Sequence, residues 1–215
     1  MLDVKAIEVS IGRVQVLRKV SLQVPERSMI GIVGRNGAGK TTLMRAIMGL
    51  LSLRAGDITF LGLSLKGCPA HSRAALAIGY APEDRRLIPE LTVEENLMIP
   101  VWATGTKNPS ARLEEVYDLI PEAKLMRSRR ALHLSGGQQK LVAIGRACMS
   151  GTKLLLLDEP FEGVAPALSK RISEVVSSLR PLGLSIVLSG ADLQHTGKNL
   201  DRVYKLDRGE IVSDA

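Results

Sequence analysis

Residues 34–41 read Gly34-Arg35-Asn36-Gly37-Ala38-Gly39-Lys40-Thr41, which is the spacing of a phosphate-binding loop. The loop follows the apolar run 29–33, which predicts a buried strand. It precedes residues 42–50, whose apolar spacing predicts a helix. Glycines let the backbone turn its N–H groups toward phosphate oxygens, and a helix N-terminus adds positive potential. The sequence therefore predicts nucleotide binding on a strand–loop–helix unit.

Individual residues of this loop have separate expected roles. Lys40 can reach the β- and γ-phosphates of a nucleotide, and the Thr41 hydroxyl can ligate Mg²⁺. The other expected nucleotide contacts in the loop and the first helical turn are Gly34, Asn36, Gly37, Ala38, Gly39 and Thr42.

A second strand is predicted at residues 153–157, where Lys153 is followed by four leucines without polar alternation. Such a run is typical of a parallel strand covered by helices on both faces, and ligands bind at the carboxyl ends of such strands. Asp158 stands at that end, where its carboxylate can hold Mg²⁺. Glu159 is the candidate to polarise the attacking water.

The segment Leu134-Ser135-Gly136-Gly137-Gln138-Gln139 precedes a predicted helix that runs to about Met149. Ser135 suits an N-cap, and the two glycines leave backbone N–H groups bare at the positive helix end. Taken alone, Ser-Gly-Gly is also typical of a flexible loop. Together with its neighbours it resembles the signature motif of ATP-binding cassette (ABC) proteins.

This resemblance covers essentially the whole chain, because the phosphate loop, the signature and the Walker B motif (the strand at 153–157 with Asp158 and Glu159) occur in the family's order. It implies ATP and Mg²⁺ as cofactors, and two hydrolytic domains that pair head to tail. Ser135, Gly136, Gly137 and Gln138 would then cap the γ-phosphate held by the partner's phosphate loop. The implied fold is an α/β P-loop NTPase core with a mostly parallel sheet, N-terminal antiparallel strands and a helical subdomain.

The expected organisation is one domain over residues 1–215, with a core at about 1–83 and 151–215 and a helical subdomain at about 84–150. Residues 2–24 alternate between apolar and polar, which predicts antiparallel strands. Further elements are expected along the chain: strands at 56–60, 78–81 and 184–188, a helix at 166–180 and a terminal hairpin at 203–212.

Composition narrows the partners and the location. The net charge is +7, but Lys and Arg are dispersed and aromatic residues make up 3% of the chain, which argues against a nucleic-acid partner. A basic surface near anionic inner-leaflet lipid is the preferred explanation. No apolar run approaches the roughly 18 residues of a membrane span, and the N-terminus lacks a secretion signal. We therefore expect a peripheral protein on the cytoplasmic face of the inner membrane, with Cys68 and Cys148 reduced.

Residues 80–97 resemble the corresponding loop of importer ATPases for branched-chain amino acids, whose relatives handle urea and short amides. Most ABC ATPases carry Gln where this chain has Glu83, whereas the branched-chain group typically has Glu. The resemblance implies that Glu83 contacts the Mg²⁺ or lytic-water region. It also implies contact with transmembrane permease subunits and, indirectly, a periplasmic or extracellular solute-binding protein. Trp102 could belong to the core or to a subunit contact.

Three departures from the family pattern bear on activity. Ile11 stands where an aromatic residue usually stacks on adenine, which forfeits about 1 kcal/mol of stacking. Phe161 replaces the usual small residue after the Walker B motif. Ala191 aligns with the switch residue, usually His or Gln, and can neither donate to the γ-phosphate nor hold a water; His195 could substitute or be a surface histidine.

Two functions remain open from these residues. Lys40, Thr41, Asp158 and Glu159 support a hydrolytic motor that drives a transporter. The missing switch side chain supports a regulatory, slow subunit that pairs with a more active second ATPase. Homodimer and heterodimer are both compatible with the sequence. A soluble DNA-repair ATPase is disfavoured because no long coiled-coil insert exists.

Overall fold

A computed structural model describes residues 1–105, 108–193 and 200–214. Its main sheet has six strands, which the structure orders as β10 (Glu210–Asp214), β9 (Arg202–Asp207), β3 (Met29–Val33), β8 (Ser185–Gly190), β7 (Leu154–Leu157) and β6 (Ile78–Ala81). All neighbours from β9 to β6 pair in parallel, and only β10 runs antiparallel. The mostly parallel core is therefore confirmed.

A second sheet of four strands is antiparallel throughout. In spatial order it contains β2 (Val14–Val24), β1 (Leu2–Ile11), β4 (Ala55–Phe60) and β5 (Leu63–Ser64). β1 buries Leu2 and Val4, as period-two alternation requires, and it buries Ile7 and Val9 after an irregularity between Val4 and Ile7 that interrupts the alternation once. The predicted N-terminal antiparallel strands are confirmed.

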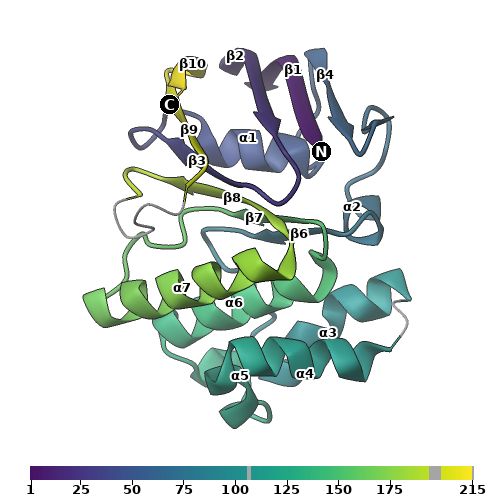
Figure 1. Cartoon of the computed structure of the whole chain (residues 1–215), viewed down its shortest axis with the longest axis vertical. Helices are drawn as coiled ribbons and strands as arrows, with labels where there is room; N and C mark the ends of the chain where they lie inside the picture. Colours follow the sequence, from purple (N-terminus) through teal and green to yellow (C-terminus); the bar gives the residue numbers. More distant parts are fainter. Residues whose placement is uncertain (106–107, 194–199, 215) are drawn as a thin grey trace.

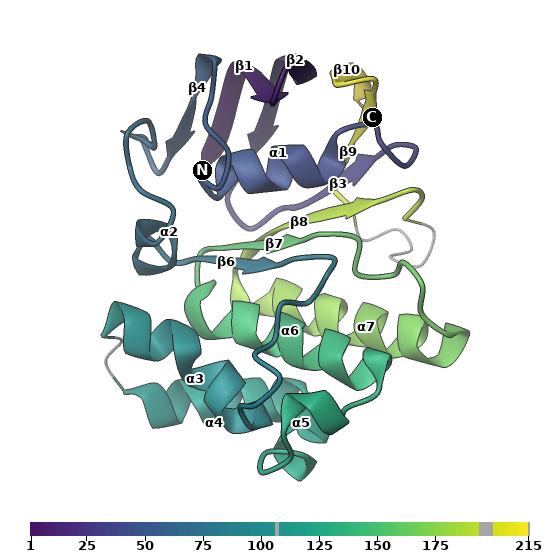
Figure 2. The same ribbon diagram turned by 180° about the vertical axis from the view of Figure 1, so that it is seen from behind.

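The helices form separate layers around the main sheet (Figure 1). They are α1 (Lys40–Ile47), α2 (Ser72–Ala75), α3 (Val93–Thr104), α4 (Pro109–Leu119), α5 (Pro121–Leu125), α6 (Gly136–Ser150) and α7 (Pro166–Leu179), with 3₁₀ turns η1 (Ala131–His133) and η2 (Arg180–Leu182). α1 lies between the two sheets, while α6 and α7 lie side by side under the main sheet, and α3 to α5 lie beyond them (Figures 1 and 2).

Strand β7 explains why its sequence does not alternate. Leu155 and Leu157 belong to the hydrophobic cluster shared with α6 and α7. Leu154 and Leu156 belong to the other cluster, shared with α1 and the antiparallel sheet. All four are fully buried. A strand covered on both faces needs apolar residues at every position, as the sequence predicted.

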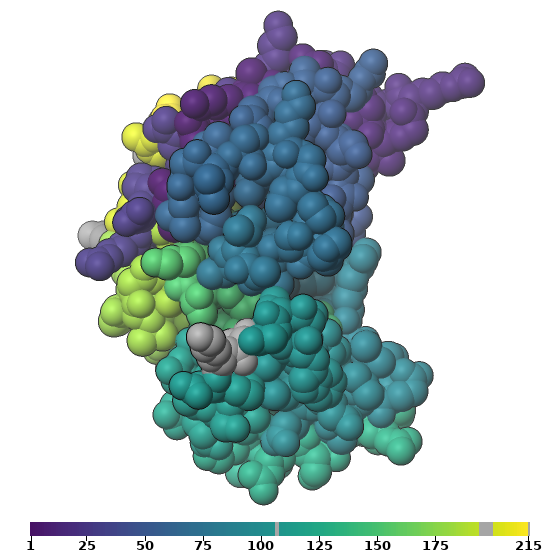
Figure 3. Space-filling view, turned by 90° about the vertical axis from the view of Figure 1, so that its right-hand side faces the viewer, coloured from purple at the N-terminus to yellow at the C-terminus, as the bar shows by residue number. Residues whose placement is uncertain are grey.

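The helical segment connects closely to the core through α6. This helix packs on α3 and also against β6 and β7. At Gly79 the approach is so close that a Cβ atom would lie 2.1 Å from the Ala147 carbonyl oxygen. In Figure 3 the teal helices at 93–125 form a lower lobe, and the purple and blue N-terminal residues form an upper one. The division at residues 84 and 150 stays a prediction.

Candidate nucleotide site

The phosphate loop turns between the end of β3 at Val33 and the start of α1 at Lys40. Gly39 is the N-cap of α1 with a φ of 110°, a left-handed conformation that glycine adopts without strain. At Gly34 a Cβ would lie 2.3 Å from the Leu206 carbonyl oxygen, so no larger residue fits. The helix begins two residues before the predicted Thr42, which places Lys40 and Thr41 on its first turn.

Lys40 is buried and its ammonium group is held over the loop. It donates to the carbonyl oxygens of Gly34, at 2.6 Å, and Arg35, at 3.1 Å. It also pairs with Glu159, whose Oε1 lies 3.1 Å from Nζ. The structure thus brings together the predicted phosphate-binding lysine and the predicted catalytic carboxylate. A phosphate at this loop would compete with Glu159 for the ammonium group.

Asp158 follows β7 and is surrounded by hydroxyl donors. Its Oδ1 accepts from Thr41 Oγ1 at 3.2 Å and from Ser189 Oγ at 2.7 Å. Its Oδ2 accepts from the Tyr80 hydroxyl at 3.1 Å. These contacts join the first turn of α1 to the ends of β6, β7 and β8. Two of the three predicted Mg²⁺ ligands, Thr41 and Asp158, are therefore hydrogen-bonded to each other.

Carboxylates crowd this edge of the sheet. Burial raises the pKa of Asp158 above its usual value, although hydrogen bonds from Ser189, Thr41 and Tyr80 oppose the shift. Loss of hydration, together with the charges of Glu159 and Asp158, also raises the pKa of Glu83, which lies on the exposed loop after β6. A site where nearby negative charges raise the pKa of a carboxyl group suits a divalent cation.

The donor set suits Mg²⁺ that also binds a nucleotide. Within residues 1–105, 108–193 and 200–214, no group of three or more acidic, histidine or cysteine side chains converges into a metal cluster. Mg²⁺ in nucleotide sites typically takes one or two protein ligands, with phosphates and waters completing its shell. Thr41 and Asp158 match that requirement, and Glu83 is near enough to them to interact electrostatically.

Replacing Asp158 by Asn is expected to raise the free energy of unfolding of the nucleotide-free protein by about 1 kcal/mol at pH 7. The folded-state pKa lies above the usual 3.8, so the folded state holds the proton more tightly and loses stability as the pH rises past 3.8. An amide removes that loss and keeps hydrogen-bonding capacity. Urea denaturation in EDTA between pH 3.5 and pH 8 measures the difference.

The gain should shrink as the pH falls toward 3.8 and disappear below it, because the wild-type carboxyl is then protonated in both the folded and the unfolded state. Asp118→Asn, on an exposed position of α4, provides the control and should leave the free energy of unfolding at pH 7 unchanged. A destabilised Asp158→Asn protein at pH 7, or a gain that grows on acidification, would contradict this interpretation of the site.

The signature segment forms the N-terminus of α6, as predicted. Ser135 Oγ accepts from the Gln138 N–H at 3.3 Å, and Gln138 Oε1 accepts from the Ser135 N–H at 2.9 Å. This capping box leaves Ser135 and Gly136 exposed, while Gly137 packs so closely on Leu168 that a Cβ would lie 2.5 Å from it. The flexible-loop alternative does not hold.

The signature segment does not contribute to its own chain's phosphate cavity. A cavity of about 200 Å³ beside the loop is lined by Val16, Gly37, Gly39, Lys40, Thr41, Thr42 and Glu159. None of the signature residues 135–138 is among them. This separation leaves the signature free to face another molecule.

The residues that depart from the family pattern have distinct positions. Ile11 is at the tip of the β1–β2 hairpin with half of its surface exposed, and Val16 on β2, which the sequence analysis missed, lines the phosphate cavity. Ala191 follows β8 and lines a small cavity of about 100 Å³ together with Glu159 and Phe161. His195 lies outside the described residues.

Three further residues of the site were missed from the sequence: Tyr80, Lys140 and Ser189. Ser189 donates to Asp158 and accepts from the Glu159 backbone N–H at 3.0 Å. Its signal was a polar residue at the carboxyl end of an otherwise apolar strand. No neighbouring residue in the sequence marks Tyr80 or Lys140 as part of the site. Tyr80 bonds to Asp158, 78 residues away, and Lys140 bonds to Glu159, 19 residues away.

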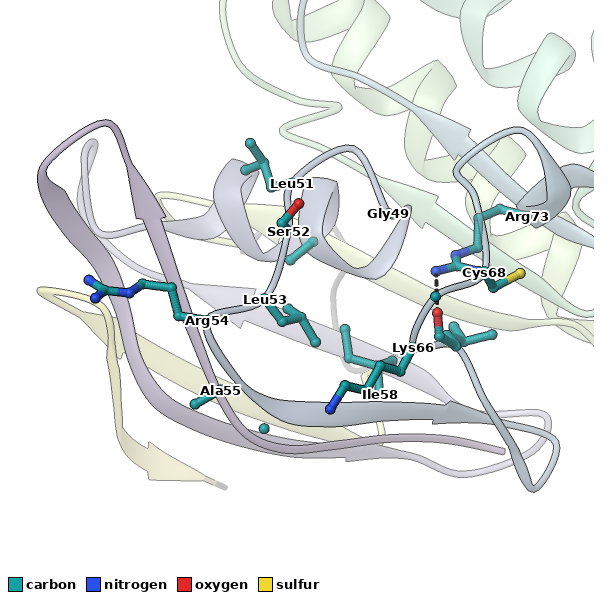
Figure 4. A pocket seen from close by; sticks show the side chains of 14 residues that line it. Gly49, Leu51, Ser52, Leu53, Arg54, Ala55, Ile58, Lys66, Cys68 and Arg73 are labelled. Carbon is teal, nitrogen blue, oxygen red and sulfur yellow. Dashed lines mark hydrogen bonds between the residues drawn. The ribbon is translucent and has the colours of Figure 1, made fainter.

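A separate cavity of about 400 Å³ lies beyond the C-terminal end of α1, away from the predicted site residues (Figure 4). Arg54 and Arg73 are at its opposite ends. Arg73 is buried and donates to the carbonyl oxygens of Ile47 and Leu65, both at 3.1 Å. These bonds connect the end of α1 to the chain after β5, which is a structural role.

Comparison with known proteins decides the family. The profile of the ABC transporter family matches residues 17–162, which include the phosphate loop, the signature and the Walker B motif. The chain is an ABC transporter ATP-binding protein. It is accordingly an ATPase of this family, a class whose subunits dimerise and act with membrane permeases. No helix in the described part of this ABC ATPase has the length and apolar character to cross a bilayer.

The relatives of this ABC ATPase include importers and exporters. It is 37% identical to the high-affinity branched-chain amino acid transport ATP-binding protein BraG of Pseudomonas aeruginosa, over 99% of this chain and 91% of BraG. It is 35% identical to the lipopolysaccharide export system ATP-binding protein LptB of Haemophilus influenzae, over 93% and 83% of the two chains. A solved ABC transporter cassette in its ADP conformation superposes with a TM-score of 0.85 at 26% identity, covering 100% of this chain and 90% of that one.

Proposed function

We propose that this chain is the ATP-hydrolysing subunit of an importer for branched-chain or other hydrophobic amino acids, or for related amides or urea. The observation that carries the proposal is the similarity to BraG over nearly the full length of both chains. Glu83, in the loop that resembles the branched-chain group, supports it. The site geometry supports the hydrolytic part.

ATP binding is assigned to the phosphate loop. The backbone N–H groups of residues 34–39 and the dipole of α1 attract the phosphates, and Lys40 neutralises the β- and γ-phosphate charge. Ile11 and Val16 would cover the base and sugar side from the β1–β2 hairpin. Thr41 and Asp158, with Glu83 nearby, would hold Mg²⁺, which when bound neutralises charge on the phosphate oxygens.

Hydrolysis is assigned to Glu159. Its carboxylate is buried beside Lys40, and its backbone has a φ of 49°. Once a phosphate competes for the Lys40 ammonium, the carboxylate becomes available to accept a hydrogen bond from the attacking water. Ser135, Gly136, Gly137 and Gln138 of a second copy, or of a second ATPase subunit, would donate to the γ-phosphate and complete the site.

The proposed partners follow from this role: transmembrane permease subunits, a second ATPase subunit and, indirectly, a periplasmic or extracellular solute-binding protein. The proposed location is the cytoplasmic face of the inner membrane. No nucleic-acid partner is proposed. In this proposal the permease and the solute-binding protein select the solute, since the ATPase contacts the permease and not the solute.

Co-purification from the native membrane tests the assignment. Tagged protein should bring down two multi-span permeases and a second cassette, and amino-acid uptake should fall when the chain is removed. Recovery with a lipopolysaccharide exporter, the activity named for the LptB relatives, would overturn the importer assignment. Recovery without any membrane protein would overturn the transport role.

The alternative, a slow subunit in a heterodimer, is favoured by one observation. Ala191 lines the same small cavity as Glu159 and offers no hydrogen-bonding side chain there. Ala191→His is therefore expected to raise kcat for ATP hydrolysis by about 10-fold, because a donor near the γ-phosphate stabilises the developing charge. Steady-state phosphate release by the purified protein measures this, with KM for ATP expected to stay within twofold.

Ala191→Leu is the matched control, since it adds bulk without a hydrogen-bonding group. It should leave kcat unchanged or lower. Equal turnover by wild type and Ala191→His would show that alanine at this position does not limit the enzyme, and the slow-subunit alternative would lose its support.

A further inference from the structure

Lys140 is a buried lysine on α6, five residues after the signature serine. The residue is 5% exposed. Its ammonium group donates to two main-chain carbonyl oxygens, that of Glu159 at 2.9 Å and that of Glu162 at 2.7 Å. No ion pair among the described residues includes Lys140, and the carboxylates of Glu83, Glu162 and Glu159 act on it only through longer-range attraction. Burying an ammonium group costs desolvation free energy, which two backbone carbonyl groups offset only in part. An apolar side chain would fill the same space without that cost.

The carbonyl group that Lys140 holds belongs to a residue in an unusual conformation. Glu159 has a φ of 49°, in the left-handed region that costs a non-glycine residue about 1 kcal/mol or more. Its N–H donates to Ser189 Oγ at 3.0 Å, so Ser189 and Lys140 hold the residue from both sides. A further bond from the Glu162 N–H to the Glu159 carbonyl, at 3.2 Å, closes the turn.

The same lysine is rigidly attached to the signature. Ser135 caps the helix that carries Lys140, and α6 continues unbroken from Gly136 to Ser150. A displacement of the N-terminal end of α6 therefore moves the ammonium group that holds Glu159. In the proposed dimer the signature contacts ATP bound to the neighbouring copy, whereas Glu159 serves the ATP bound to its own chain.

We propose that Lys140 is a positioning residue that fixes the backbone of Glu159 and couples it to the signature helix. When the signature contacts the ATP bound to the neighbouring copy, Lys140 would align Glu159 at the ATP bound to its own chain. This inference rests on the proposed function, in which Glu159 is the base and the signature contacts the neighbour's nucleotide. Lys140 does not line the phosphate cavity, so it acts on alignment and not on ATP binding.

Lys140→Met tests the proposal, because methionine keeps the length and bulk of the side chain and removes its hydrogen bonds. We expect kcat to fall about 30-fold, KM for ATP to stay within twofold, and the Hill coefficient for ATP to drop toward 1. Lys140→Arg, which retains a cationic donor, should restore most of kcat. Unchanged kcat and Hill coefficient in a folded Lys140→Met protein would overturn the proposal.

Arg112→Met is the matched control, because Arg112 Nε donates to the Cys148 carbonyl oxygen at the opposite end of the same helix, at 3.1 Å. It should leave kcat and the Hill coefficient unchanged. An equal loss of kcat in Arg112→Met would mean that Lys140 only stabilises α6, which would overturn its positioning role.

If Lys140→Met does not fold, Lys140→Gln carries the test, because glutamine keeps one hydrogen-bond donor. Lys140→Gln should retain the wild-type KM for ATP and lose kcat. A wild-type kcat in this variant would overturn the proposal.

A double-mutant comparison separates this inference from the proposed function. In a Glu159→Gln background, Lys140→Met should cause no further loss of turnover, since the residue it positions is already inactive. Wild-type activity in Glu159→Gln would overturn the proposed function itself. Inactive Glu159→Gln together with wild-type activity in Lys140→Met would overturn only the positioning role.

Discussion

Glu159→Gln is expected to lower kcat for ATP hydrolysis by about 10³-fold while ATP still binds. Glutamine has the shape of glutamate but cannot accept the proton of the attacking water. The change also removes the ion pair that holds Lys40, 3.1 Å from Glu159 Oε1, so the ammonium group becomes more available to phosphate. Phosphate release measures kcat, and calorimetric titration with ATP measures affinity, which should be equal or tighter.

Glu162→Gln is the control within the same loop. Its carbonyl oxygen accepts from Lys140, but its side chain is exposed, so kcat should stay within twofold of wild type.

Glu159→Gln should also elute as an ATP-dependent dimer in size-exclusion chromatography, because ATP hydrolysis no longer separates the two copies. Retention of more than a tenth of wild-type kcat would remove Glu159 from the catalytic role.

Gly79→Ala is expected to lower the free energy of unfolding by about 3 kcal/mol. A Cβ at this position would lie 2.1 Å from the Ala147 carbonyl oxygen and 2.8 Å from the Gly151 Cα atom. Both are backbone atoms, which cannot rotate away, so α6 must move off β6 or the strand must shift. Urea denaturation monitored by circular dichroism measures the loss.

Gly62→Ala separates the steric effect from the general cost of replacing glycine. Gly62 has a φ of 80°, but a Cβ added there would meet nothing within 4 Å, so its substitution should cost only about 1 kcal/mol. Equal losses from the two substitutions would mean that α6 and β6 are not in the close contact described. Because α6 carries the signature and Lys140, Gly79→Ala should also lower kcat in whatever fraction remains folded.

The sequence was informative wherever function depends on a short segment. Residues 34–41 predicted the phosphate loop, and the leucines at 154–157 predicted a strand buried on both faces, because both patterns arise from local geometry. Ser135 predicted a helix start for the same reason, since a capping box uses residues only three positions apart. Asp158 and Thr41 were expected to share one ion, and the structure places them in contact.

Contacts between distant segments were not predictable from one sequence. Lys140 has the sequence context of a polar helix start, and only folding reveals that it is buried against the loop at 159–162. Tyr80 continued an apolar strand in the sequence, yet its hydroxyl reaches Asp158. The ion pair between Lys40 and Glu159 was likewise missed, because both residues were assigned to the nucleotide and not to each other.

The measurement that tests the central claim most directly is the structure of Glu159→Gln bound to Mg²⁺ and ATP. We predict a closed pair in which the γ-phosphate touches Lys40 of one subunit and lies within hydrogen-bonding distance of Ser135 on the other. An ATP molecule that contacts residues of one chain only, with Ser135 of every copy facing solvent, would contradict this prediction.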